Sequence, residues 1–84
     1  MNLEFDKNAL EDLQYWVEID RKKALKILAL VEESAQSSFK GTGKPEPLKY
    51  TFQGCWSRRI DQEHRMVYKV NNQTVRILSC RYHY

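Results

Sequence analysis

Apolar side chains recur at helical spacing through the first part of the chain. Residues 2–5 alternate polar and apolar, and Asn8 with Glu11 three positions later forms a capping pair that predicts the start of a helix. On one face this helix would carry Leu10, Leu13, Trp16 and Val17. A second helix is predicted from Asp20, a good N-cap residue, with apolar positions that fit a 3.6-residue period, namely Ala24, Ile27, Leu28, Val31 and Ala35. Both apolar faces are interpreted as core.

Residues 37–47 interrupt this pattern with two glycines and two prolines, which predicts a loop. Gly41 and Gly43 do not form a phosphate-binding motif, because no GKS or GKT follows them. Pro45 and Pro47 bracket Glu46 and limit the backbone freedom of that acid.

From Cys55 onward the period changes to two, which predicts strands. In the first strand Trp56, Arg58 and Ile60 alternate with Cys55, Ser57 and Arg59, and a hairpin is expected at residues 61–63. In the next strand an apolar face of Met66, Tyr68 and Val70 alternates with Arg65, Val67 and Lys69. After a turn at residues 71–72, a last strand from Val75 to about Arg81 has apolar residues of both parities, which predicts a central strand covered on both faces.

These elements predict one α+β domain over residues 1–84. Two N-terminal helices would pack on the apolar face of a mostly antiparallel sheet, which leaves Arg59 and Arg65 on the open face. That open face is the candidate functional site.

Charge is distributed unevenly along the chain. The chain has 14 Lys and Arg against 11 Asp and Glu, and from Gly41 onward eight bases face three acids. A basic region of this kind favours a polyanionic partner, either nucleic acid or an acidic protein segment, although a merely soluble basic face remains an alternative.

No signal peptide and no membrane-length apolar run is present, so we expect a soluble cytoplasmic protein that does not bind membranes. Cys55 and Cys80 are expected to be reduced, with a single disulfide as the alternative.

The second half supplies the groups that RNA cleavage without a metal requires: a base for the 2′-hydroxyl, an acid for the leaving 5′-oxygen, and cations for the phosphate. Glu46 can be the base, His83 the acid, and the cations can be Lys49, Arg59 and Arg65. No cofactor is expected, and a metal site is disfavoured because the chain's only histidines, His64 and His83, lack paired carboxylates at ligand spacing. Each residue also has a structural explanation, as a solvated acid, a surface ion-pair partner or a tail residue. The residues alone therefore support an RNA-binding domain that could carry acid–base chemistry.

Four ordered blocks make the whole chain resemble the YoeB toxins of the RelE superfamily, which are ribosome-dependent mRNA interferases of bacterial type II toxin–antitoxin systems. The blocks are residues 43–49 (GKPEPLK), 56–60 (WSRRI), 63–68 (EHRMVY) and 80–84 (CRYHY). The resemblance implies that Glu46 is the general base, His83 the general acid and Arg65 the principal stabiliser of the transition state. It further implies phosphate-binding roles for Lys49 and Arg59, a supporting role for Glu63 and a substrate-holding role for Tyr84. The implied fold is a microbial-ribonuclease-like sheet with two N-terminal helices.

The same resemblance implies cleavage of mRNA in the ribosomal A site, with 2′,3′-cyclic phosphate and 5′-hydroxyl ends. It also implies a YefM-type antitoxin whose disordered tail blocks the C-terminal site, and a homodimer or a complex of two toxins with two antitoxins. Two positions depart from the family pattern, because Tyr50 stands where histidine is more usual and Cys55 where an aromatic is common. Two alternatives remain: a toxin on this scaffold that binds another target such as DNA gyrase, and an RNA-binding module without catalysis.

Overall fold

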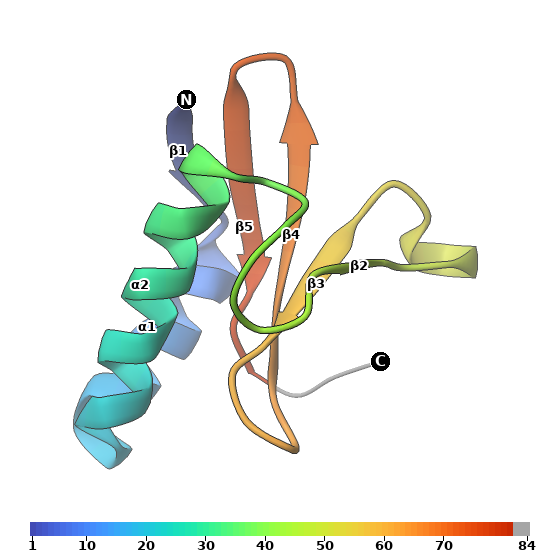
Figure 1. Cartoon of the computed structure of the whole chain (residues 1–84). Helices are drawn as coiled ribbons and strands as arrows, with labels where there is room; N and C mark the ends of the chain where they lie inside the picture. The colour runs from blue at the N-terminus through green and yellow to red at the C-terminus, as the bar shows by residue number, and fades with distance from the viewer. Residues whose placement is uncertain (82–84) are drawn as a thin grey trace.

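The computed structural model describes residues 1–81, in which two α-helices and a short 3₁₀ turn accompany a five-stranded sheet. Figure 1 shows the helices together on one face of the sheet, with the other face open. The elements run in the order β1 (Asn2–Phe5), α1 (Lys7–Ile19), α2 (Arg21–Gln36), β2 (Glu46–Pro47), η1 (Tyr50–Phe52), β3 (Trp56–Arg59), β4 (Arg65–Asn71) and β5 (Thr74–Ser79). The predicted α+β layout is confirmed.

The strands lie in the order β1-β5-β4-β3-β2. β1 runs parallel to β5, and the other neighbouring strands pair antiparallel, so the sheet is mostly antiparallel as predicted. β5 lies between β1 and β4, but the prediction that it is covered on both faces is wrong. Its Val75 and Ile77 are buried under the helices, whereas the Arg76 side chain, 55% exposed, lies on the open face. The predicted loop at residues 37–47 also ends earlier than expected, because Glu46 and Pro47 form β2.

The helices join without a loop, since Asp20 ends α1 and caps α2. The Asp20 side chain accepts a hydrogen bond from the Lys23 N–H, so the predicted start of the second helix is confirmed. The predicted start of the first helix at Asn8 is wrong. The N-cap is Asp6, two residues earlier, where β1 ends with the Asp6 N–H bonded to the Ile77 carbonyl at 2.9 Å.

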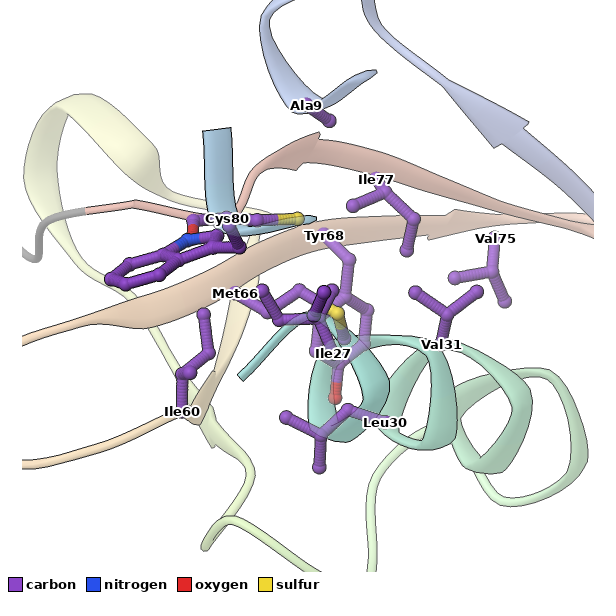
Figure 2. Close-up of a cluster of buried hydrophobic side chains, with 12 residues drawn as sticks. Ala9, Ile27, Leu30, Val31, Ile60, Met66, Tyr68, Val75, Ile77 and Cys80 are labelled. Carbon is purple, nitrogen blue, oxygen red and sulfur yellow. The ribbon is translucent and has the colours of Figure 1, made fainter. Parts of the chain in front are cut away.

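The core lies between α2, α1 and the helix-facing side of the sheet (Figure 2). Ile27, Leu30 and Val31 of α2 pack toward the sheet, where Met66 and Tyr68 are fully buried. The even face of β4 is therefore the one that packs toward the helices, as predicted, although Val67 on the odd face is also buried. Three residues expected in the core are instead substantially exposed, namely Leu10, Val17 and Leu28. The described helices include none long and apolar enough to cross a membrane.

Candidate active site

The candidate site is built where β2, β3 and β4 run side by side on the open face. Glu46 of β2 lies opposite Ser57 of β3, and Arg59 of β3 lies opposite Arg65 of β4. Residues opposed across a ladder face the same side, as do residues two apart on one strand. Strand pairing thus brings together three predicted site residues that are widely separated in sequence, and the predicted open-face placement of the two arginines is confirmed.

Glu46 and Arg65 are in direct contact. The Arg65 Nη1 donates to the Glu46 carboxylate in a short ion pair, and the same nitrogen donates to the Ser57 hydroxyl at 3.1 Å. The Arg65 side chain is 21% exposed and that of Glu46 is 50% exposed. Ser57 is fully buried beneath them. Sequence reasoning gave Ser57 no role, although its parity with Arg59 placed it on the correct face.

A hollow of about 190 Å³ opens beside the pair and is lined by Arg59, Asp61, Gln62 and Arg65. Asp61 holds the β3–β4 turn that forms one wall, because its carboxylate accepts the N–H groups of Glu63 at 2.7 Å and His64 at 2.6 Å. Burial would raise the pKa of Asp61, but these bonds and the Lys23 ammonium outweigh burial and lower it. The hollow thus presents guanidinium groups from two strands at a fixed turn.

A second hollow, of about 580 Å³, lies on the other half of the open face, over β1, β5 and the far end of β4. Its Arg76 is paired with Asp6 at 2.5 Å and with Glu4 at 3.7 Å. Arg76 thus has two acid partners, whereas among the described residues at the smaller hollow Arg65 has one, Glu46, and Arg59 makes no ion pair. No predicted site residue lines the larger hollow, so the smaller one is the better candidate for binding a phosphate.

The segment that leads into Glu46 is bonded to β3. The Arg59 N–H donates to the Gly43 carbonyl at 2.7 Å, and Gly43 has φ +84°. A Cβ at Gly43 would meet the Arg59 backbone at 3.0 Å, so only glycine fits this close approach without a shift. Gly43 is thus required by backbone packing rather than by a phosphate loop.

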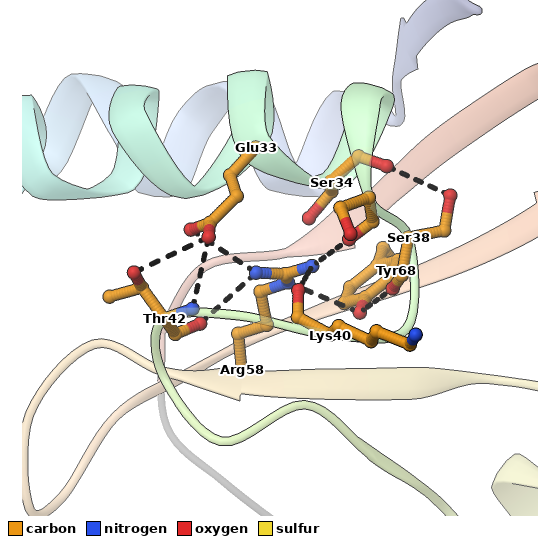
Figure 3. A network of polar contacts seen from close by, with 8 residues as sticks. Glu33, Ser34, Ser38, Lys40, Thr42, Arg58 and Tyr68 are labelled. Carbon is orange, nitrogen blue, oxygen red and sulfur yellow. Dashed lines mark hydrogen bonds and ion pairs between the residues drawn. The ribbon is translucent and has the colours of Figure 1, made fainter.

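Arg58 is the main attachment of the loop before Gly43 (Figure 3). Its side chain is fully buried on the helix-facing side of β3. The guanidinium donates to carbonyl groups of Ser37 at 2.5 Å, Lys40 at 2.9 Å and Thr42 at 3.1 Å. Its positive charge is balanced by the Glu33 carboxylate at 3.3 Å. One buried cation therefore fixes the course of the loop that precedes the predicted base.

Glu33 and Tyr68 complete this network. The Thr42 N–H donates to the Glu33 carboxylate and is the main reason that the pKa of Glu33 is lowered, with a further contribution from Arg58. The Tyr68 hydroxyl accepts from the Arg58 Nε at 3.3 Å and donates to the Ser38 carbonyl at 2.6 Å. Burial raises the pKa of Tyr68, so its hydroxyl stays protonated as a donor at neutral pH.

The chain beyond β5 is held by α1 as it approaches His83. The Trp16 Nε1 donates to the Cys80 carbonyl at 2.8 Å, and the Cys80 N–H donates to the Asp12 carboxylate at 2.9 Å. The Arg81 guanidinium lies 3.5 Å from the centre of the Tyr15 ring. The predicted site residues His83 and Tyr84 lie outside the described residues.

The other predicted site residues stand at the margin. Lys49 is exposed at the start of η1, and Glu63 is exposed in the β3–β4 turn. Neither side chain is hydrogen-bonded or ion-paired to Glu46 or Arg65 within residues 1–81. Cys55 and Cys80 are both free and buried. Burial raises the pKa of the Cys80 thiol to about 12, with a smaller effect from Asp12. Among the described residues, no group of three or more His, Cys, Asp or Glu side chains could hold a metal ion.

Known proteins resemble this chain over its full length. The sequence profile described as "YoeB-like toxin of bacterial type II toxin-antitoxin system" matches residues 5–84. "Toxin YoeB" of Escherichia coli (strain K12) is 44% identical, and the match covers 100% of both chains. The solved "YoeB/ParE toxin from Agrobacterium tumefaciens" is 40% identical with a TM-score of 0.95 and covers 100% of both chains.

Two solved relatives from Staphylococcus aureus are each 41% identical, and their matches cover 100% of this chain and 98% of theirs. One is a "YoeB dimer" with a TM-score of 0.91, and the other is a "heterotetrameric complex of YoeB-YefM toxin-antitoxin" with a TM-score of 0.89.

Proposed function

The chain belongs to the family of YoeB-like toxins of bacterial type II toxin–antitoxin systems, and from this membership we propose that it is a ribosome-dependent endoribonuclease. It would cleave mRNA in the ribosomal A site by acid–base catalysis without a metal and so inhibit translation. The observation that carries the proposal is the contact between Glu46 and Arg65 on the open face. The proposed reaction requires a general base close to a cation that stabilises the reacting phosphate. This contact holds a carboxylate and a guanidinium together in that way.

Glu46 takes the proton of the 2′-hydroxyl in the proposed reaction, and the 2′-oxygen attacks the adjacent phosphorus. Its carboxylate is half exposed, so a ribose can approach it, while its backbone is fixed by pairing with β3. A base whose backbone is fixed keeps its geometry when the substrate arrives.

Arg65 stabilises the charge that grows on the phosphate oxygens. Both of its hydrogen bonds to described residues use Nη1, so Nε and Nη2 are left to bind phosphate. The Ser57 hydroxyl and the Glu46 carboxylate fix the plane of the guanidinium. Arg59, opposite Arg65 across the ladder, adds a second cation at the hollow.

His83 protonates the leaving 5′-oxygen, which gives 2′,3′-cyclic phosphate and 5′-hydroxyl ends. Histidine suits this role because its ordinary pKa, about 6.5, lies near neutral pH. The bonds of Cys80 to α1 support the assignment, since they anchor the chain three residues before His83. We also propose that Lys49 and Tyr84 hold the substrate and that Glu63 supports the site.

The open shape of the site supports dependence on the ribosome. The hollow beside Arg65 is small and the base is half exposed, so these groups alone would position a flexible RNA poorly. A ribosome that already holds the mRNA would supply that positioning. A ribosomal target would in turn place the protein in the cytoplasm.

We further propose that a YefM-type antitoxin neutralises the protein and that the toxin forms a dimer. The S. aureus relatives support both partners, since one was solved as a dimer and another with YefM. The excess of basic residues from Gly41 onward suits an acidic, initially disordered antitoxin segment.

The test is cleavage of mRNA on purified programmed ribosomes. Glu46→Gln and His83→Gln should each lower the rate about 10²- to 10⁴-fold, the usual contribution of a positioned acid or base. Glu32→Gln makes the same chemical change on the exposed surface of α2 and should cleave normally. Growth arrest with intact mRNA would overturn the proposal and favour a toxin that acts on another target.

A further inference from the structure

Tyr50 combines high exposure with an unusual backbone conformation. The residue is 90% exposed, the highest value among the exposed large hydrophobic residues of the described chain. Its φ is +59°, in the left-handed region that bulky residues rarely occupy. The sequence had already singled out this position as a departure from the family pattern.

The loop that carries Tyr50 is closed and internally bonded. At its base the Leu48 N–H donates to the Cys55 carbonyl at 2.9 Å, beside the last pair of the β2–β3 ladder. At its tip the N–H groups of Phe52 and Gln53 donate to the carbonyls of Lys49 and Tyr50, at 3.2 and 3.0 Å. Tyr50 is therefore exposed because an ordered turn presents it to solvent.

Stability does not explain tyrosine at this position. Glycine or asparagine would adopt the positive φ more readily, and a tyrosine that is 90% exposed gains almost no burial in return. Strained backbone of this kind concentrates at functional sites. The combination therefore points to a ligand for the ring.

The position of the turn relates it to the proposed catalytic groups. Tyr50 follows Glu46 by four residues of mostly extended chain, a separation on the order of 13 Å. Figure 1 shows η1 projecting beyond the sheet on the side away from the helices. An RNA strand whose phosphate lies at Glu46 and Arg65 could therefore reach the Tyr50 ring with a flanking nucleotide.

We propose that Tyr50 is a nucleobase platform, on which a base that flanks the cleaved phosphate stacks while Lys49 beside it neutralises the RNA backbone. This inference rests on the proposed function. Aromatic rings next to cations are the usual means of holding single-stranded RNA, because every base has a face that can stack. The exposed neighbours of Tyr50 in the turn, Lys49, Thr51 and Gln53, are polar, and Phe52 is half-buried, which suits a single stacked base better than an apolar protein interface.

The first experiment compares three full-length variants in the ribosome cleavage assay. Tyr50→Phe keeps the ring and should retain activity, whereas Tyr50→Gly should raise the concentration needed for half-maximal cleavage by about 5- to 150-fold, the usual effect of losing one stacked base. Because glycine suits the positive φ, Tyr50→Gly should unfold at or above the wild-type temperature. Leu25→Ala, which trims another exposed apolar residue, 57% exposed on α2, should match the wild type in both measurements.

The second experiment replaces single nucleotides that flank the cleavage site with abasic ones. An abasic nucleotide at the position that stacks on Tyr50 should weaken cleavage by the wild type to the level of Tyr50→Gly. The same nucleotide should cause no further loss of cleavage in Tyr50→Gly. Equal penalties for both proteins at every position, or unchanged cleavage by Tyr50→Gly, would overturn the platform while leaving the ribonuclease assignment intact. If the wild type itself produced no RNA ends, the proposed function would fail first.

Discussion

At the scale of single residues, Arg58 has the most demanding environment in the described chain. A fully buried guanidinium is stable only when its charge is balanced and its N–H groups are bonded. Here Glu33 supplies the charge, and carbonyls of the loop at residues 37–42 accept the N–H groups. The loop therefore holds this shape only while Arg58 is present.

Arg58→Met should destabilise the protein by about 3–5 kcal/mol, since it leaves Glu33 and the loop carbonyls without their partner. Arg58→Lys keeps the charge but loses the planar fork, so its loss should be smaller but measurable. Urea unfolding measures both free energies. A loss below about 1 kcal/mol for Arg58→Met would mean that the loop holds its shape through other contacts.

The alternation of side chains along the strands predicted part of this site and could not predict the rest. Alternation placed Arg59 and Arg65 on the open face and Arg58 on the opposite one, and the structure confirms both. It could not show what Arg58 binds, because those carbonyls belong to an irregular loop without periodicity. It also could not reveal the contact between Glu46 and Arg65, which depends on strand register rather than on spacing.

At the scale of elements, α1 fixes the end of the described chain. Asp12 and Trp16, one helical turn apart, bind the N–H and carbonyl groups of Cys80. The Trp16 ring also makes an edge contact with His64 of the β3–β4 turn, with ring centres 4.8 Å apart. One face of α1 thus joins the turn beside Arg65 to the segment that leads to His83.

Trp16→Phe preserves an aromatic ring but removes the donor to the Cys80 carbonyl. We expect a stability loss of about 1–3 kcal/mol from the unpaired buried carbonyl. We also expect slower single-turnover cleavage, because the segment that carries the proposed acid loses an anchor. Ile27→Val, a change on α2 in the same core that leaves the Trp16 donor in place, is the stability control, with an expected loss of about 0.5–1.5 kcal/mol. If Trp16→Phe and Ile27→Val cleaved mRNA at equal rates, the hydrogen bond from Trp16 to Cys80 would stabilise the fold without contributing to catalysis.

The sequence predicted the presence of the two helices better than it predicted which face of each helix is buried. In α2 four of the five expected core positions are buried or half-buried, but Leu28 is exposed and Leu30, which was not expected in the core, is buried. In α1 the positions Leu10 and Val17 compete with Ala9 and Trp16 for the core. Small Ala9 is fully buried while the larger Leu10 is not, since α1 packs closely on β5. Periodicity counts apolar residues and cannot weigh how closely two elements approach.

At the scale of the whole molecule, two carboxylates attach the two ends of α2 to β3 and the turn that follows it. Near the end of α2, Glu33 reaches Arg58 and Thr42, and near its start Lys23 reaches Asp61 of the β3–β4 turn at 3.1 Å. The two contacts tie the helical layer to the strands that carry the proposed site. Both carboxylates have a lowered pKa, so both contacts weaken in acid.

The folded protein should therefore lose stability as the pH falls below the ordinary values of 4.5 for Glu33 and 3.8 for Asp61. A lowered pKa means that the unfolded chain binds protons first on acidification. The stabilisation is thus complete above the ordinary pKa and is lost as the pH falls through the folded value. Thermal unfolding between neutral pH and about pH 3 measures this loss. Glu33→Gln should be less stable at neutral pH and should show a shallower decline, whereas Glu32→Gln on the neighbouring exposed position should follow the wild type. An unchanged slope in Glu33→Gln would assign the acid sensitivity to other carboxylates.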